Sequence, residues 1–180
     1  EVATGSATGT GTITLTDTAT LETSGNIANP ITASNAANNK TVRALADATL
    51  SGALTIDSGQ TTEDPRLRFE LDNGTTLTID SQIGGTGTPG FRIDDIGGNT
   101  TGGTVILSNR ANNYDGKTQV HAATLRVTHN DALSNSTVEL DDTNATLELG
   151  DGTATTISIS NAIEADTGGG GTDFCGKQFG

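Results

Sequence analysis

Apolar residues recur as short apolar-x-apolar pairs through residues 103–150, and polar turn residues separate one pair from the next. The pairs are Val105/Leu107, Leu125/Val127, Val138/Leu140 and Leu147/Leu149. Each pair points two side chains to one face of a strand and the residue between them to the other face. One pair is too small to hold a fold, but pairs stacked at a fixed period bury a continuous apolar column. The pattern therefore predicts a β-solenoid.

The period can be measured from segments of the chain that resemble each other. The run LTIDS at 54–58 returns at 77–81, which is 23 residues later. The run FELD at 69–72 has its counterpart VELD at 138–141, 69 residues later and three times the same spacing. At roughly 20–23 residues per coil, the pattern predicts about eight coils in one all-β, right-handed parallel β-helix.

Later pairs indicate that the period drifts as the loops lengthen or shorten. Leu125 and Leu147 are 22 residues apart, and Val138 and Ile157 are 19 apart. The side chains expected to face inward are Ile13, Leu15, Leu54, Ile56, Leu77, Ile79, Val105, Leu107, Leu125, Val127, Leu147, Leu149, Ile157 and Ile159. Thr, Asp and Asn are expected to face outward, and the first strand is expected near Ile13.

The stretch from Ala33 to Leu50 is less regular. Its sequence lacks a sustained apolar stripe of helical period, which favours a polar loop leading into a strand at Thr41–Leu45. One or two helical turns stay open as the alternative, because Ala, Arg and Leu are good helix formers.

Residues 103–133 resemble the autotransporter-associated β-strand repeat of bacterial passenger domains. The matching segments are 103–108 (GTVILS), 111–118 (ANNYDGKT), 123–127 (ATLRV) and 131–133 (DAL). The sequence departs from the repeat at Lys117 and Ala123, where Gly is usual, and at Ser134. The resemblance implies a right-handed parallel β-helix exported to the bacterial surface, and it implies no active site.

Composition is consistent with one domain spanning residues 1–180, with a Gly/Thr-rich segment at 1–11 and a Gly-rich segment at 168–180. Apolar residues make up 32% of the chain and aromatic residues 3%, so the core should be thin and aliphatic. A net charge of −13 would repel nucleic acid and anionic lipid. No apolar run is long enough for a membrane helix, and a chain beginning at Glu1 is expected to be processed or cut from a longer protein.

Two acidic segments are the contenders for catalysis. They are Arg92-Ile93-Asp94-Asp95 and Asp141-Asp142. Paired carboxylates could act on polysaccharides, but an Asp-Asp pair flanked by Gly and Asn is more typical of a solvated turn. We therefore expect no catalytic residue and no enzyme activity.

The sequence also gives little indication of a metal site. His121 and His129 have no Cys or carboxylate at metal-ligand spacing along the chain, so we expect them to be exposed or stacked between coils. Gly168–Asp173 matches one copy of a calcium β-roll nonapeptide, and Gly84–Gly87 lacks the Asp. A calcium site of that kind needs a neighbouring repeat, so a flexible Gly-rich turn is favoured, and we expect no cofactor and no metal.

Neither end of the chain offers a helix or charged strand that would cover the last coil. We therefore expect a non-enzymatic structural protein, extracellular or on the bacterial cell surface, that assembles head to tail with itself. Phe174, Cys175 and Phe179 are the residues expected at the junction, where Cys175 could form an intermolecular disulfide or stay a free thiol. An adhesin passenger fragment is the first alternative, and a β-helical polysaccharide-acting enzyme is the second.

Overall fold

A computed structural model of the chain describes residues 9–34, 39–57, 67–86, 90–97, 102–151 and 156–165. These residues form sixteen strands and no helix. The strands are β1 (Ile13–Leu15), β2 (Thr20–Thr23), β3 (Ile31–Ala33), β4 (Lys40–Ala44), β5 (Ala48–Leu50), β6 (Leu54–Asp57), β7 (Leu67–Leu71), β8 (Thr76–Ile79), β9 (Ile83–Thr86), β10 (Phe91–Asp95), β11 (Thr104–Leu107), β12 (Thr118–Val120), β13 (Thr124–Val127), β14 (Val138–Leu140), β15 (Thr146–Leu149) and β16 (Ile163–Ala165).

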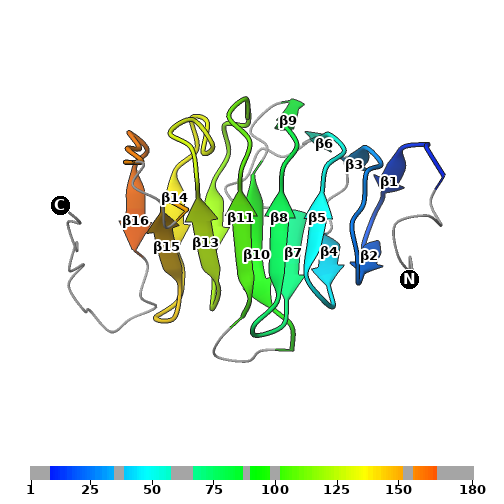
Figure 1. The fold of residues 1–180 in the computed structure, drawn as a ribbon, viewed down its shortest axis with the longest axis horizontal. Helices are drawn as coiled ribbons and strands as arrows, with labels where there is room; N and C mark the ends of the chain where they lie inside the picture. The colour runs from blue at the N-terminus through cyan, green and yellow to red at the C-terminus, as the bar shows by residue number, and fades with distance from the viewer. Residues whose placement is uncertain are drawn as a thin grey trace.

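The strands stack into three parallel sheets that together make a β-solenoid (Figure 1). One sheet has the order β1-β3-β6-β9, the second β2-β4-β7-β10-β12-β14-β16, and the third, across the front of Figure 1, β5-β8-β11-β13-β15. Sixteen strands over three sheets correspond to about five turns. The all-β parallel solenoid is therefore confirmed, whereas the expected eight coils are not.

The register shows which of the predicted repeats correspond to stacked positions. On the five-stranded sheet Leu125 pairs with Leu147, so the predicted step between these two residues is confirmed. On the seven-stranded sheet Val138 pairs with Ile163, so its predicted step to Ile157 is wrong. The segments between stacked strands therefore differ in length from one turn to the next.

The repeat from which the period was measured joins two different sheets. Leu54 lies on β6 and Leu77 on β8, and the register partner of Leu54 is Ile83, further along the chain than Leu77. The 54–58 and 77–81 segments resemble each other because strands on different sheets face the same core with the same alternation.

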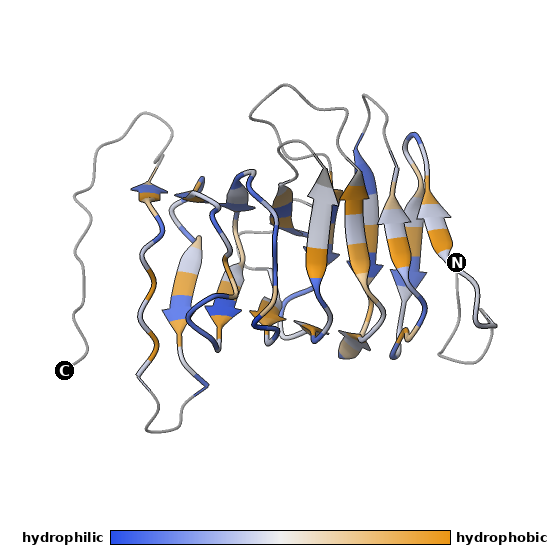
Figure 2. Ribbon diagram, turned by 90° about the horizontal axis from the view of Figure 1, so that it is seen from above, coloured by the Kyte–Doolittle hydropathy of each residue, from blue (hydrophilic) through white to orange (hydrophobic). Residues whose placement is uncertain are grey.

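The predicted inward positions are mostly correct through the body of the solenoid. Nine of the fourteen are buried: Leu15, Leu54, Ile56, Leu77, Ile79, Val105, Leu107, Leu125 and Val127. Ile13, Leu147, Ile157 and Ile159 are only partly buried against this core. Leu149 is exposed, which contradicts the expectation for it, and β15 is the last described strand of its sheet. Figure 2 shows how hydrophobic and hydrophilic residues alternate along the strands of the solenoid.

The core is less purely aliphatic than expected. Phe69, Phe91 and Tyr114, on successive turns of the solenoid, are fully buried and their rings contact one another edge-to-face or tilted. Ring centroids are 5.4 Å apart for Phe69 and Phe91, and 5.2 Å apart for Phe91 and Tyr114. These three residues are all the aromatic residues among the described positions, so the described chain uses its aromatic rings to fill the solenoid.

The irregular stretch after Ala33 contains no helix in its described residues. Strand β4 ends at Ala44, one residue before the end of the predicted strand Thr41–Leu45, and Leu45 is exposed beyond it. Gly84 and Gly85 lie within β9, where Asn113 packs so closely that a Cβ on Gly84 would lie 2.5 Å from its Oδ1. No helix long enough and apolar enough to cross a bilayer occurs among the residues that the structure describes.

Candidate functional site

The outer face of the seven-stranded sheet carries a ladder of charged side chains. Glu22, Arg43, Glu70 and Asp94 hold equivalent register positions on β2, β4, β7 and β10. The Arg43 guanidinium lies 2.8 Å from Glu22 Oε1 and 2.6 Å from Glu70 Oε2. The hydrogen bond to Glu70, with a further one to Glu22, raises the pKa of Arg43. Charges of opposite sign therefore alternate across β2, β4 and β7.

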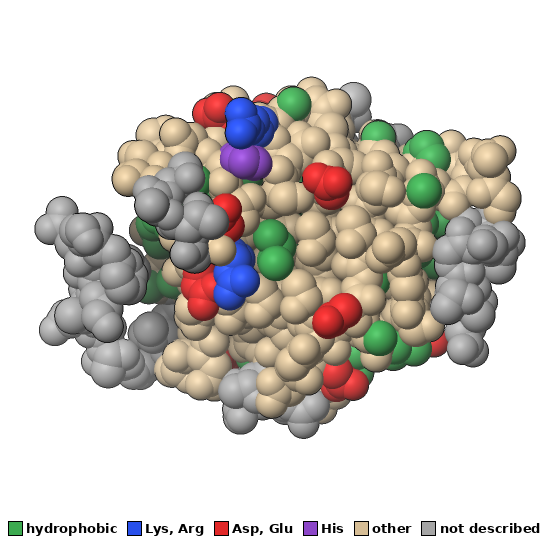
Figure 3. All heavy atoms as spheres, viewed as in Figure 1, with side chains coloured by type: hydrophobic (Ala, Val, Ile, Leu, Met, Phe, Trp, Pro, Cys, Tyr) green, Lys and Arg blue, Asp and Glu red, His purple; other side chains and the backbone are tan. Residues whose placement is uncertain are grey.

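The five-stranded sheet has a different outer face. Its outward register positions are mostly threonine, including Thr78 on β8 and Thr104 and Thr124 on the next two strands. Figure 3 shows this side of the molecule, where uncharged side chains and backbone predominate and charged groups are scattered. Arg126 and Glu148 form an ion pair of 2.7 Å on this sheet.

The charged ladder becomes denser at β10. Asp94 Oδ2 lies 2.9 Å from Arg92 Nε and 3.7 Å from Arg68 Nη1. Asp94 Oδ1 lies 3.0 Å from His121 Nδ1. The backbone explains this contact, because His121 follows β12 directly and its N–H donates to the Ile93 carbonyl at 2.9 Å.

The next turn brings the second acidic segment to the same place. Asp141 and Asp142 follow β14, and the Asp141 N–H donates to the Val120 carbonyl at 2.9 Å. Arg92 Nη1 then lies 3.4 Å from Asp141 Oδ2, and His121 Nε2 lies 3.9 Å from Asp142 Oδ2. The two acidic segments, distant in sequence, therefore form one cluster.

The surroundings of His121 differ from those that the sequence predicted. Its ring lies between carboxylates of the preceding and following turns and is half-buried. Spacing along the chain could not indicate these partners, because they come from neighbouring coils and not from nearby sequence. A register assignment of β10, β12 and β14 would have indicated them.

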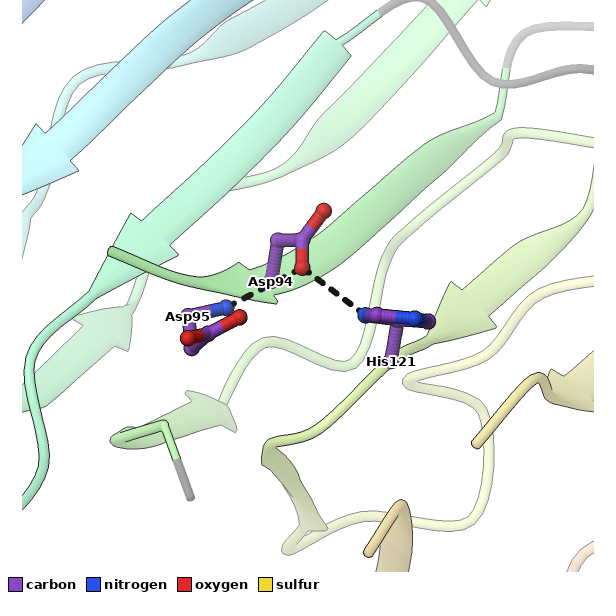
Figure 4. Close-up of side chains that lie close together, drawn as sticks. All are labelled: Asp94, Asp95 and His121. Carbon is purple, nitrogen blue, oxygen red and sulfur yellow. Dashed lines mark hydrogen bonds and ion pairs between the residues drawn. The ribbon is translucent and has the colours of Figure 1, made fainter. Parts of the chain in front are cut away.

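Asp95 completes the cluster from the inner side of the strand. It is 7% exposed and pairs in register with the core residue Leu71. Its Oδ2 has no hydrogen-bond partner. Figure 4 shows the side chains of Asp94, Asp95 and His121 converging, and one ligand atom from each lies within 4.8 Å of the others.

The remaining predicted site residues do not join this cluster. His129 lines a separate hollow of about 240 Å³ together with Arg110, Asp131 and Ile157. Phe174, Cys175 and Phe179, the expected junction residues, lie outside the described residues, as does the glycine run of Gly168–Asp173.

The arrangement combines an imidazole, four carboxylates and two guanidinium groups from neighbouring turns of the solenoid. Such a set can hold a cation, transfer a proton or simply join the turns by ion pairs. Comparison of the chain with protein-family models, curated proteins and solved structures gave no match. The resemblance of residues 103–133 to the autotransporter repeat therefore stays a prediction.

Proposed function

We propose that this protein is a non-enzymatic structural subunit, exported to the bacterial surface or the extracellular space. In this proposal a right-handed β-solenoid continues from one copy to the next, head to tail. The repeat-like sequence of residues 103–133 supports the export and the handedness. The exposed apolar side chains at the last described turn of the solenoid support the assembly.

The observation that carries the proposal is the state of the apolar column at its last described turn. Leu125 and Val127 on β13 are fully buried, but Leu149, the register partner of Val127, is 46% exposed. Ile163 on β16 is 39% exposed. An apolar column that ends open is stabilised when another apolar surface covers it.

The strand edges offer a second kind of contact at the same end. Among the described strands, β15 and β16 are terminal strands of their sheets, and β1 and β2 are terminal strands at the opposite end of the solenoid. Terminal strands present backbone N–H and C=O groups that a neighbouring strand can pair with. Contact between two different ends is heterologous, and when its rotation does not close it produces an open filament.

Electron microscopy of the protein across a concentration series tests this proposal. We expect uniform fibres one solenoid wide or bundled from such units. The double variant Leu149→Lys/Ile163→Lys should prevent fibre formation, because it places two charges on the apolar end. Leu45→Lys is the matched control, because Leu45 is also 46% exposed but follows β4 within the body of the solenoid.

Two results would contradict end-to-end assembly. One is a monodisperse monomer at high concentration in analytical ultracentrifugation. The other is an equal loss of fibres in the Leu45→Lys control, which would indicate contact through the side of the solenoid. Phe174, Cys175 and Phe179 stay sequence-based predictions for the junction, and truncation before residue 168 tests them separately.

The adhesin alternative predicts a surface that stacks on sugar rings. Phe69, Phe91 and Tyr114 are buried, so no aromatic residue of the described chain is offered for such stacking. A glycan array with saturable hits would favour the adhesin over the structural subunit.

A polysaccharide-acting enzyme is the second candidate, and the convergence of Arg92, Asp94 and Asp141 favours it. Acid–base cleavage of a glycosidic bond requires two carboxylic groups held on one surface. Turnover of pectin-like polymers that is lost in Asp94→Asn and retained in Asp131→Asn would establish this function. Asp131 is the control because it lies beside His129, away from the cluster.

A further inference from the structure

We propose that Asp94, Asp95 and His121 bind one divalent transition-metal cation where the neighbouring strands β10 and β12 of the seven-stranded sheet end. This inference is independent of the proposed assembly, because the site lies in the middle of the solenoid between β10 and β12. Zn²⁺ is the probe by which it can be tested.

The first argument is the geometry of the three side chains. One imidazole nitrogen and two carboxylate oxygens lie within 4.8 Å of one another, and His121 Nδ1 and Asp94 Oδ1 are 3.0 Å apart (Figure 4). Ligands about 2.0–2.2 Å from a zinc ion lie roughly 3–4 Å from each other. The three atoms thus need only a small contraction to surround an ion.

The second argument is the unsatisfied carboxylate oxygen of Asp95. Because Asp95 is 7% exposed and its Oδ2 has no hydrogen-bond partner, nothing compensates this oxygen for its desolvation. A buried acceptor without a partner destabilises a fold, and buried charges are normally paired or bound to metal. A proton shared by His121 and Asp94 would not compensate the buried carboxylate of Asp95, whereas a cation held by all three side chains would.

The surrounding residues resemble the outer shell of a metal site. Arg92 Nε binds Asp94 Oδ2 at 2.9 Å, which leaves Oδ1 turned toward His121. Asp142 Oδ2 lies 3.9 Å from His121 Nε2, on the far side of the ring. This distance is longer than a hydrogen bond, but a carboxylate on that side of a ligating histidine favours the tautomer that carries the proton on Nε2 and leaves the Nδ1 lone pair free for the metal.

The donor set indicates the class of ion. Imidazole nitrogen suits zinc and its transition-metal neighbours, while calcium and magnesium prefer oxygen ligands alone. Three protein ligands leave one or more positions for water, as in open zinc sites. Arg92 and Arg68 place positive charge nearby and weaken cation binding, so we expect an affinity of roughly micromolar order rather than that of a closed structural site.

The experiment is a titration of the full 180-residue chain with Zn²⁺ by calorimetry at pH 7.5. The protein carries no histidine tag and has Cys175→Ser, because a tag or a thiol would bind zinc by itself. We expect one equivalent to bind, and we expect His121→Gln and Asp95→Asn each to weaken it about 100-fold or more. Asp142→Asn should weaken it about 10-fold, as the loss of an outer-shell partner does in other sites.

His129→Gln is the matched control, because His129 is the second histidine of the chain and lies in a separate hollow. It should leave zinc binding unchanged. Circular dichroism verifies that each variant is folded, and His121→Gln keeps the test valid if Asp95→Asn unfolds, since His121 is half-buried. Absence of saturable zinc binding below about 1 mM, or equal weakening by His129→Gln and His121→Gln, would overturn the proposal. Calcium binding unaffected by His121→Gln would overturn it too.

Discussion

The ring of Tyr114 packs against that of Phe91 at a centroid distance of 5.2 Å and an interplanar angle of 52°. This contact fixes the hydroxyl of Tyr114 inside the solenoid, where it lies 2.9 Å from Thr118 Oγ1. The Thr118 hydroxyl in turn donates to Ser136 Oγ at 3.0 Å. Three hydroxyl groups from two neighbouring turns therefore form a buried chain in an otherwise apolar core.

The burial of Tyr114 predicts a loss of stability in alkali. Burial raises the pKa of Tyr114 to about 12, against the effect of its bonds to Thr118 and Ser136. The folded pKa lies above the unfolded value near 10, so the stabilisation is complete below pH 10 and is lost as the pH rises to about 12. The loss should be roughly 2–3 kcal/mol across this window.

Absorbance at about 295 nm measures this titration directly, because Tyr114 is the only tyrosine of the chain. We expect phenolate to form together with loss of the β-sheet signal in circular dichroism. Tyr114→Phe should remove the alkaline step at a cost of about 1 kcal/mol near neutral pH. Phenolate formation at pH 10 in the folded protein would contradict the buried position of the hydroxyl.

Backbone atoms of the preceding turn lie so close to Gly103 that there is no room for a side chain at this position. A Cβ at this position would overlap the Thr75 carbonyl oxygen and lie 2.7 Å from the Asp72 carbonyl oxygen. Because both contacts are with backbone, Gly103→Ala should destabilise the fold by about 1–3 kcal/mol, measured by urea unfolding. Gly11→Ala is the control, since no atom lies within 4 Å of its added Cβ, and it should change stability by less than about 0.5 kcal/mol.

The sequence was sufficient to predict the class of fold but not which strands stack on which. The step from Leu125 to Leu147 was correct because these two residues lie on adjacent strands of one sheet. The prediction that Leu54 and Leu77 lie one coil apart on the same face was wrong. Apolar residues alternate in the same way on every face of a solenoid, so strands on different sheets look alike in sequence. The segment from Ile13 to its partner Ile31 is much shorter than that from Leu54 to its partner Ile83. Because the turns differ so much in length, the sequence has no fixed period from which the sheet of each strand could be assigned.

Prediction of the candidate site also required knowledge of which strands stack on which. Asp94, Asp142 and His121 could each be named as candidates from the sequence, but each looked like an isolated surface residue. Their convergence requires the register of β10, β12 and β14 to be known to the residue. The alternation of Phe91, Ile93 and Asp95 places Asp95 on the inward face, but the sequence does not show that its carboxylate lacks a hydrogen-bond partner there.

The charged ladder predicts a salt-dependent contribution to stability at Arg43. Replacing Arg43 by Met keeps the packing of the stem but leaves Glu22 and Glu70 facing each other across β4 without a positive charge. We expect a destabilisation of about 1 kcal/mol at low ionic strength, which should shrink in about 1 M NaCl.

Arg126→Met is the control for the ladder, because Arg126 has an ion pair with Glu148 at a more exposed position, with side chains 38% and 43% exposed. Its effect should be smaller than that of Arg43→Met. Equal effects of the two substitutions, or an effect at Arg43 that is independent of salt, would contradict a role for alternating charge.

The last prediction concerns the difference between the middle and the end of the apolar column. Leu125 is fully buried on β13, whereas Leu149 is 46% exposed on the next strand of the sheet. Leu125→Ala should cost about 2–5 kcal/mol in urea unfolding of the dilute monomer, and Leu125→Asp should abolish folding because it buries an unpaired charge. Leu149→Ala should cost less than about 1 kcal/mol, because water already contacts this side chain.

The same pair of variants links stability to the proposed assembly. If copies stack end to end, Leu149 becomes buried at the junction, and the cost of Leu149→Ala should rise with protein concentration. The cost of Leu125→Ala should stay constant, because Leu125 is buried within each copy. A Leu149→Ala effect that is large in dilute monomer would mean that this end is covered within the same chain, and it would argue against the open apolar end on which the assembly rests.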